Sequence, residues 1–172
     1  MQAGAGGGYG HETLQFRKQP GANRPPRGTA SDMGRHKHIH VIRMKKQALV
    51  TGATSGIGRA TALRLAAEGY DIIATGRRSE RLESLRREIE AAGGRCTTLT
   101  FDVRSEEAVR RNLEPLGRVD LLVNNAGLAA GLEHIDKGDT ADWDAMIDTN
   151  VKGLLYVTRV IPPKMVAAGG GH

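Results

Sequence analysis

A glycine-rich turn between a short apolar run and a helical pattern is the segment with the clearest chemistry. Leu49 and Val50 precede the turn, and glycines follow in the spacing G-x-x-x-G-x-G. Glycine permits a tight turn and close approach of the backbone to a pyrophosphate, and a helix N-terminus presents free N–H groups to an anion. An ordinary glycine-rich loop is the alternative. The pattern predicts that a dinucleotide binds at Gly52, Ala53, Thr54, Ser55, Gly56, Ile57 and Gly58.

A basic pair follows the second apolar strand, about 20 residues beyond the turn. Arg77 and Arg78 stand where an acidic residue would hold the ribose 2′-hydroxyl of NAD. A guanidinium pairs instead with a 2′-phosphate, so the pair predicts NADP as the cofactor. Arg77 is nearer the strand and is the expected phosphate contact, whereas Arg78 has the alternative of being a solvated charge.

Two further polar segments follow predicted strands. Asp102-Val103 ends the third strand, and Asn124-Asn125-Ala126-Gly127 ends the fourth. Ligands bind at the carboxyl ends of parallel strands, so we expect these segments to meet at one edge of the sheet. Asp102 has the alternative of capping a strand end. Asn124 is expected to tie strands together rather than to bind a ligand.

Alternating apolar strands and amphipathic helices position these segments. Strands are predicted over 48–51, 71–75, 96–101 and 121–124. Helices are predicted over 59–68, from Ser79 to Gly93, from Ser105, and from near Thr140 toward Pro162-Pro163. Apolar strands that alternate with helices imply an α/β fold with a parallel sheet covered on both faces.

The chain divides by composition into two regions. Residues 1–43 are rich in Gly, Pro, Arg and His without an apolar period, so we expect a disordered basic arm. Residues 1–45 hold eight basic and two acidic residues, which accounts for the whole net charge of +6. We expect no nucleic-acid partner for this arm, because only Tyr9 and Phe16 interleave its charges. We also expect no metal at His36–His40, because no Cys or carboxylate cluster surrounds it.

The absence of recognisable targeting signals and the presence of a single cysteine favour a cytoplasmic protein without a membrane partner. The sequence has no apolar run of transmembrane length and no secretory signal at its start. Its single cysteine, Cys96, cannot form an internal disulfide, which suits a reducing compartment.

Together these segments resemble the short-chain dehydrogenase/reductase family. The matching residues are T-G-x-x-x-G-I-G at 51–58, D-V at 102–103, N-N-A-G at 124–127 and Asn150 within T-N-V-K-G at 149–153. The resemblance covers residues 44–172 and implies a partial NAD(P)-binding domain: a Rossmann-type, doubly wound parallel sheet, truncated after about four strands. It also implies a nicotinamide cofactor, which the arginine pair specifies as NADP, hydride transfer with a small hydroxyl or carbonyl substrate, and homo-oligomers among full-length members.

Roles for individual residues follow from the same resemblance. It implies that Asp102 hydrogen-bonds the adenine, that Val103 and Asn125-Ala126-Gly127 line the cofactor, and that Asn150 is a catalytic residue which holds a water in the proton relay. A narrower similarity, to NADP-dependent 3-hydroxy acid dehydrogenases acting on serine or allo-threonine, rests on residues 74–82, 125–129 and 143–150. It implies a substrate with a β-hydroxyl group.

The sequence departs from the family in its catalytic tyrosine. The family uses a serine and a Tyr-x-x-x-Lys pair, in which the lysine lowers the pKa of the tyrosine that acts as general acid and base. Tyr9, Tyr70 and Tyr156 each lack a lysine four residues later. We therefore expect this chain to be the cofactor-binding part of an oxidoreductase and inactive alone. The alternative is a catalytically inactive nucleotide-binding or interaction module.

Overall fold

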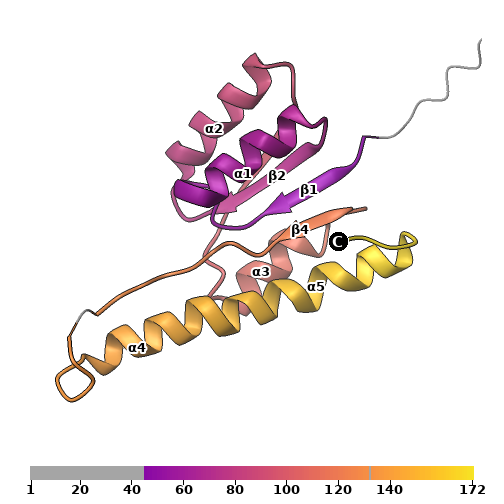
Figure 1. Ribbon diagram of the computed structural model, residues 1–172. Coiled ribbons are helices and arrows are strands. Elements are labelled where there is room, and N and C mark those ends of the chain that lie inside the picture. The colour runs from indigo at the N-terminus through magenta and orange to yellow at the C-terminus, as the bar shows by residue number, and fades with distance from the viewer. Residues whose placement is uncertain (1–44, 132) are drawn as a thin grey trace, which may run out of the picture. The chain divides into compact units, whose positions relative to one another are not determined.

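A parallel sheet organises the part of the chain that the computed structural model describes, residues 45–131 and 133–172 (Figure 1). The four strands of this part are β1 (Gln47–Val50), β2 (Asp71–Gly76), β3 (Cys96–Thr100) and β4 (Leu121–Val123). Each predicted strand lies within one residue of these bounds. The predicted arm over 1–43, with its His36–His40 run, lies outside the described residues.

The strand order is β3-β2-β1-β4, and every pair is parallel. Ala48 in β1 pairs with Ile72 on one side and with Leu121 on the other. The chain therefore moves outward from β1 to β3 and then returns to the opposite side of β1. This reversal between β1 and β4 is the position at which doubly wound sheets bind dinucleotides.

Helices connect the strands and cover both faces of the sheet. Figure 1 shows α1 (Gly56–Ala67) and α2 (Ser79–Ala91) on one face, and α3 (Glu106–Leu113) and α5 (Leu154–Ala167) on the other. A short helix, α4 (Thr140–Ile147), and a π-helical turn (Asp148–Gly153) lead into α5. The predicted doubly wound α/β class is confirmed.

The strand residues alternate between two hydrophobic cores, as a period of two requires. On one face, Ala48, Val50 and Ile72 pack with residues of α1 and α2, among them Leu82 and Leu85. On the other face, Leu49 and Ile73 pack with α3 and α5 through a second set of buried side chains: Val109, Leu113, Val157 and Ile161. All of these residues but Ile73 are at most 1% exposed, so the sheet is buried on both sides.

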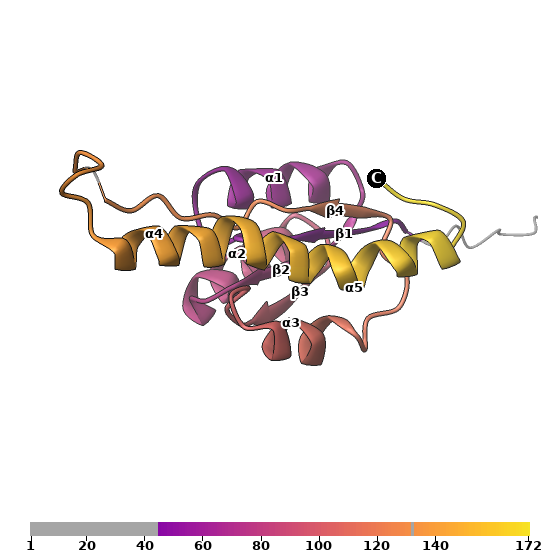
Figure 2. The same ribbon diagram turned by 90° about the horizontal axis from the view of Figure 1, so that it is seen from below.

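The final helix extends further than the sequence predicts. Figure 2 shows α4 and α5 as one continuous rod, and α5 passes through Pro162 and Pro163 to end at Ala167. Proline removes a helical hydrogen bond, but Ile161 and Met165 on either side of the pair are buried in the second core. Lys164 Nζ also donates to the backbone oxygens of Glu114 and Leu116, both at 2.8 Å. Tertiary contacts therefore keep this turn helical. Five apolar residues of the rod remain substantially exposed: Ile147, Val151, Leu154, Leu155 and Val166.

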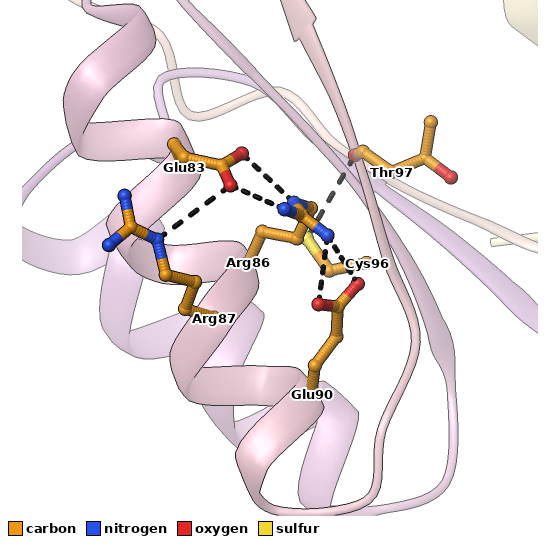
Figure 3. A network of polar contacts seen from close by, with 6 residues as sticks. All are labelled: Glu83, Arg86, Arg87, Glu90, Cys96 and Thr97. Carbon is orange, nitrogen blue, oxygen red and sulfur yellow. Dashed lines mark hydrogen bonds and ion pairs between the residues drawn. The ribbon is translucent and has the colours of Figure 1, made fainter.

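A network of ion pairs lies along α2, next to the start of β3 (Figure 3). Arg86 lies between Glu83 and Glu90, and its Nη1 donates to both carboxylate oxygens of Glu90 at 2.9 Å. Cys96 lies beneath this network, and burial raises the pKa of its thiol to about 11. A protonated, buried thiol is a poor nucleophile, so Cys96 is a packing residue.

None of the helices described, over 45–131 and 133–172, is both long and apolar enough to cross a membrane.

The start of β4 is tied to its neighbours by a buried carboxylate. The Asp120 side chain is 8% exposed and accepts from Gln47 N at 2.8 Å and from Arg118 Nε at 2.7 Å. His172 extends the pairing, since its N–H donates to Asp120 O and its own O accepts from Leu122 N. Burial acts to raise the pKa of Asp120, but the bonds from Arg118 and Gln47 and the nearby charges outweigh it, and the pKa is lowered.

Substituting Asp120→Asn is expected to destabilise the fold in a pH-dependent way. A carboxylate with a lowered pKa stabilises the folded state fully at pH above its ordinary value of about 4. This stabilisation declines below that value and is lost as the pH falls through the lower pKa of the folded state. We expect a loss of about 1–2 kcal/mol at pH 7, which shrinks toward zero below about pH 4. Urea unfolding at several pH values measures this, with the exposed Glu107→Gln as control. A pH-independent difference would contradict the assignment.

Candidate dinucleotide site

A cavity of about 210 Å³ opens at the carboxyl ends of the strands, beside the β1–β4 reversal. It brings together ten of the fifteen predicted site residues. Three further lining residues were not predicted, although Gly76 and Phe101 each directly precede a predicted residue at a strand end. The lining residues are Gly52, Thr54, Ser55, Gly76, Arg77, Arg78, Phe101, Asp102, Val103, Asn125, Ala126, Gly127 and Thr149.

Glycines let the turn after β1 pack directly against the end of β4. Gly52 has a φ of +67°, and a Cβ on it would lie 2.8 Å from Ala126 Cα. A Cβ on Gly58 would lie 2.3 Å from Asn125 Nδ2 and 2.5 Å from Gly52 O. Gly56 differs, because a Cβ on it would have none of the described atoms within 4 Å. Two of the motif glycines therefore serve packing, and the third faces open space.

The N-terminus of α1 is presented without a side-chain cap. Ser55 is the N-cap residue in extended conformation, and within the described part of the chain its side chain makes no capping bond. The first N–H groups of a helix have no partner inside the helix and attract anions. Ile57 belongs to this first turn and is 80% exposed. Ala53, in the loop before it, is fully buried, so its side chain does not face the cavity. The turn thus offers backbone donors to a phosphate.

Arg78 lies against the turn itself. Its Nη2 donates to Thr54 Oγ1 at 2.7 Å and to Ser55 Oγ at 2.8 Å. Gly76 makes room for this arrangement, since a Cβ there would lie 2.6 Å from Thr54 Cγ2. Arg77 is 61% exposed, and its Nη1 lies 3.8 Å from Asp102 Oδ2. Both guanidinium groups border the cavity, and Arg78 is the one hydrogen-bonded to the turn.

Asp102 is held by a second basic residue, Arg104. Arg104 donates through Nε and Nη2 to Asp102 Oδ2, at 2.9 and 2.7 Å. Partial burial acts to raise the pKa of Asp102, but these bonds, the Arg104 backbone N–H and the charges of Arg104 and Arg77 together lower it. The carboxylate is therefore ionised at neutral pH, beside the two arginines of the cavity.

Thr51 links the turn to the end of β4 through one buried hydroxyl. Its Oγ1 donates to Val123 O at 3.3 Å and accepts from the backbone N–H groups of Asn125 and Ala126, both at 3.0 Å. Asn125 completes the link, since its Nδ2 donates to the backbone oxygens of Thr51 and Gly52. The side chains of Thr51 and Asn125 thus hold the glycine turn and the end of β4 together by hydrogen bonds. The sequence pattern alone indicated no such role for Thr51.

Asn150 lies in the π-helical turn between α4 and α5. Its Nδ2 donates to Leu128 O and its Oδ1 accepts from Leu128 N, both at 2.8 Å. Gly127 lies next to it, because a Cβ there would be 3.3 Å from Asn150 Oδ1. These contacts place Asn150 beside the cavity without lining it.

Asn124 donates through Nδ2 to Thr158 Oγ1 in α5 at 3.0 Å. It therefore ties β4 to a helix, whereas the sequence predicts a tie between strands.

Comparison with known proteins identifies the family. The family model described as short chain dehydrogenase matches residues 46–172. The chain belongs to the short-chain dehydrogenase family, as its motifs predict. It is 48% identical over 129 residues to a probable NADP-dependent dehydrogenase of Haemophilus influenzae, covering 73% of this chain and 50% of that protein.

Two further short-chain dehydrogenases are similar to this chain. An NADP-dependent 3-hydroxy acid dehydrogenase of Salmonella typhi is 47% identical over 128 residues, which are 72% of this chain and 50% of the relative. Serine dehydrogenase, in the solved structure of its closed form complexed with NADP⁺, is 45% identical with a TM-score of 0.68, and the match covers 73% of this chain and 51% of that one. The chain spans about half the length of the curated relatives it matches.

Proposed function

We propose that residues 46–172 hold NADP(H) in the cavity, as the cofactor-binding part of an oxidoreductase that acts on a 3-hydroxy acid. The observation that carries the proposal is the position of Arg78, hydrogen-bonded to Thr54 and Ser55 of the glycine turn. A dinucleotide with a 2′-phosphate presents its pyrophosphate to the glycine turn and its 2′-phosphate to the arginine side chains. Guanidinium groups pair with phosphate through two parallel bonds. The 3-hydroxy acid is proposed from the similarity to the Salmonella typhi dehydrogenase.

The residues around the cavity fit this cofactor. The N-terminus of α1 would hold the pyrophosphate, because its N–H groups are uncapped within the described residues and Gly56 leaves space before them. Arg77 and Arg78 would pair with the 2′-phosphate, and Asp102 would accept a hydrogen bond from the adenine amine. Asn125-Ala126-Gly127 would line the remainder of the cofactor.

Asn150 has a positioning role and a proposed proton-relay role. Both sides of its amide bind the backbone of Leu128, which holds the segment after Gly127 against the π-helical turn. An amide oxygen has two lone pairs and an amide NH₂ has two hydrogens, so the Asn150 side chain can still hydrogen-bond one water.

The cofactor would supply the redox chemistry: NADP, when bound, is the hydride acceptor, and NADPH is the donor.

A catalytically inactive nucleotide-binding module is the second candidate. It is favoured by the absence from the sequence of any tyrosine with a lysine four residues later. The general acid and base of the family is therefore missing from this chain, and we expect no turnover from the chain alone.

A fusion protein tests both candidates. Residues 46–172 are joined to the C-terminal half of the Salmonella typhi relative, and oxidation of serine is measured with NADP and with NAD. We expect NADP-linked turnover with kcat/KM at least about tenfold higher for NADP than for NAD, because a charge-assisted phosphate contact is worth about 1.5–3 kcal/mol. Arg77→Asp and Arg78→Gln should each reduce this preference.

The unaltered relative is the control for activity. Equal or better use of NAD by the fusion would contradict the cofactor assignment. A folded fusion without turnover, alongside an active relative, would contradict the oxidoreductase assignment and support the inactive module.

A further inference from the structure

Arg104 holds a carboxylate of the cavity without lining the cavity itself. It binds Asp102 through three donors: Nε and Nη2 to Oδ2, and its backbone N–H to Oδ1 at 3.0 Å. Asp102 lines the cofactor cavity, whereas Arg104 lines a separate surface hollow together with Asp102, Ser105 and Asp148. Arg104 therefore occupies one face of the Asp102 carboxylate, while Asp102 itself borders the cavity.

Asp102 creates an electrostatic conflict at a 2′-phosphate site. Asp102 Oδ2 lies 3.8 Å from Arg77 Nη1, so the carboxylate competes with a phosphate for that guanidinium. Its negative charge would also repel a phosphate dianion bound by that guanidinium. Arg104 binds the same oxygen more closely, at 2.7 Å, and compensates its charge. Without Arg104, Arg77 would be the nearest remaining cation to Asp102 among the described residues.

We propose that Arg104 is a positioning residue for recognition of the 2′-phosphate. By binding Asp102 it orients the carboxylate, neutralises it, and leaves Arg77 available to the phosphate. This inference rests on the proposed binding of NADP(H) and adds a residue outside the cavity to that site. A nucleotide without a 2′-phosphate does not need Arg77, so loss of Arg104 should weaken binding of 2′-phosphorylated ligands selectively.

The test measures binding of two probes to the full chain by calorimetry: adenosine 2′,5′-bisphosphate and adenosine 5′-monophosphate. Arg104→Gln is expected to weaken the bisphosphate about fivefold, the size of one partly screened charge interaction, and the monophosphate less than about twofold. Arg104→Lys keeps the charge and should restore part of the difference. Arg110→Gln is the matched control, because Arg110 also pairs with a carboxylate, Glu114, at 2.7 Å but lies along α3.

A second substitution separates positioning from a general structural effect. In an Asp102→Asn background the charge that Arg104 compensates is gone, so Arg104→Gln should cause no further selective loss. Equal weakening of both probes by Arg104→Gln, the same selective loss in Arg110→Gln, or a selective loss that persists with Asp102→Asn would each overturn the inference. If the unaltered chain does not prefer the bisphosphate, the proposed cofactor and this inference both fail; a preference that Arg104→Gln leaves unchanged overturns the inference alone.

Discussion

Replacing Gly58 by alanine is expected to destabilise the domain by about 3 kcal/mol or more and to abolish nucleotide binding. The added Cβ would lie 2.3 Å from Asn125 Nδ2 and 2.5 Å from the backbone oxygen of Gly52. A backbone atom cannot rotate away as a flexible side chain can, so α1 must move away from β1 or the turn must rearrange. Either change moves the N-terminus of α1 from its position next to Ser55, which lines the cavity.

Gly117→Ala is the matched control for this substitution. A Cβ on Gly117 would meet no described atom within 4 Å, so the same chemical change should be nearly neutral there. Urea unfolding and NADPH fluorescence measure the two effects. Wild-type stability in Gly58→Ala would contradict the packing of the turn against Asn125.

Thr51→Val is expected to cost about 2–3 kcal/mol, although valine has nearly the same shape as threonine. Thr51 is 1% exposed, and its hydroxyl accepts from the backbone N–H groups of Asn125 and Ala126. Asn125 N has a second acceptor in Val123 O, but Ala126 N would be left without this partner in a closely packed region. The segment Asn125–Gly127, which lines the cavity, would lose its anchor, so we also expect weaker NADPH binding.

Thr51→Ser retains the hydroxyl and is the control. It should keep most of the affinity for NADPH, because the two accepted bonds are preserved. Comparable losses of stability and affinity in the serine and valine variants would show that the methyl group, rather than the hydroxyl, is what matters at this position.

The sheet and the position of the site could be predicted from the sequence because both depend on local patterns. The apolar runs around Leu49, Ile73 and Leu122 define strands by themselves, and the carboxyl ends of parallel strands must share one edge of the sheet. These two facts alone are enough to place Gly52, Asp102 and Asn125 near one another.

The features that could not be predicted depend on contacts between distant segments. The helical path through Pro162 and Pro163 follows from burial of Ile161 and from Lys164 reaching the end of α3. Likewise, the preference of Arg78 over Arg77 for the glycine turn arises from the hydroxyls of Thr54 and Ser55, which are 24 and 23 residues away in the chain. Neither contact leaves a periodic signal in the sequence.

The central claim, that the cavity beside the β1–β4 reversal holds NADP(H), is tested most directly by amide NMR of the full chain during titration with NADP⁺. We predict saturable shifts concentrated at the residues of the turn and the facing strand ends: Gly56, Ile57, Gly58, Arg77, Arg78, Asp102, Ala126 and Gly127. The groove between α3 and α5, lined by Arg110, Tyr156 and Lys164, should be unaffected. An absence of shifts at the turn, or shifts confined to that groove, would contradict the account.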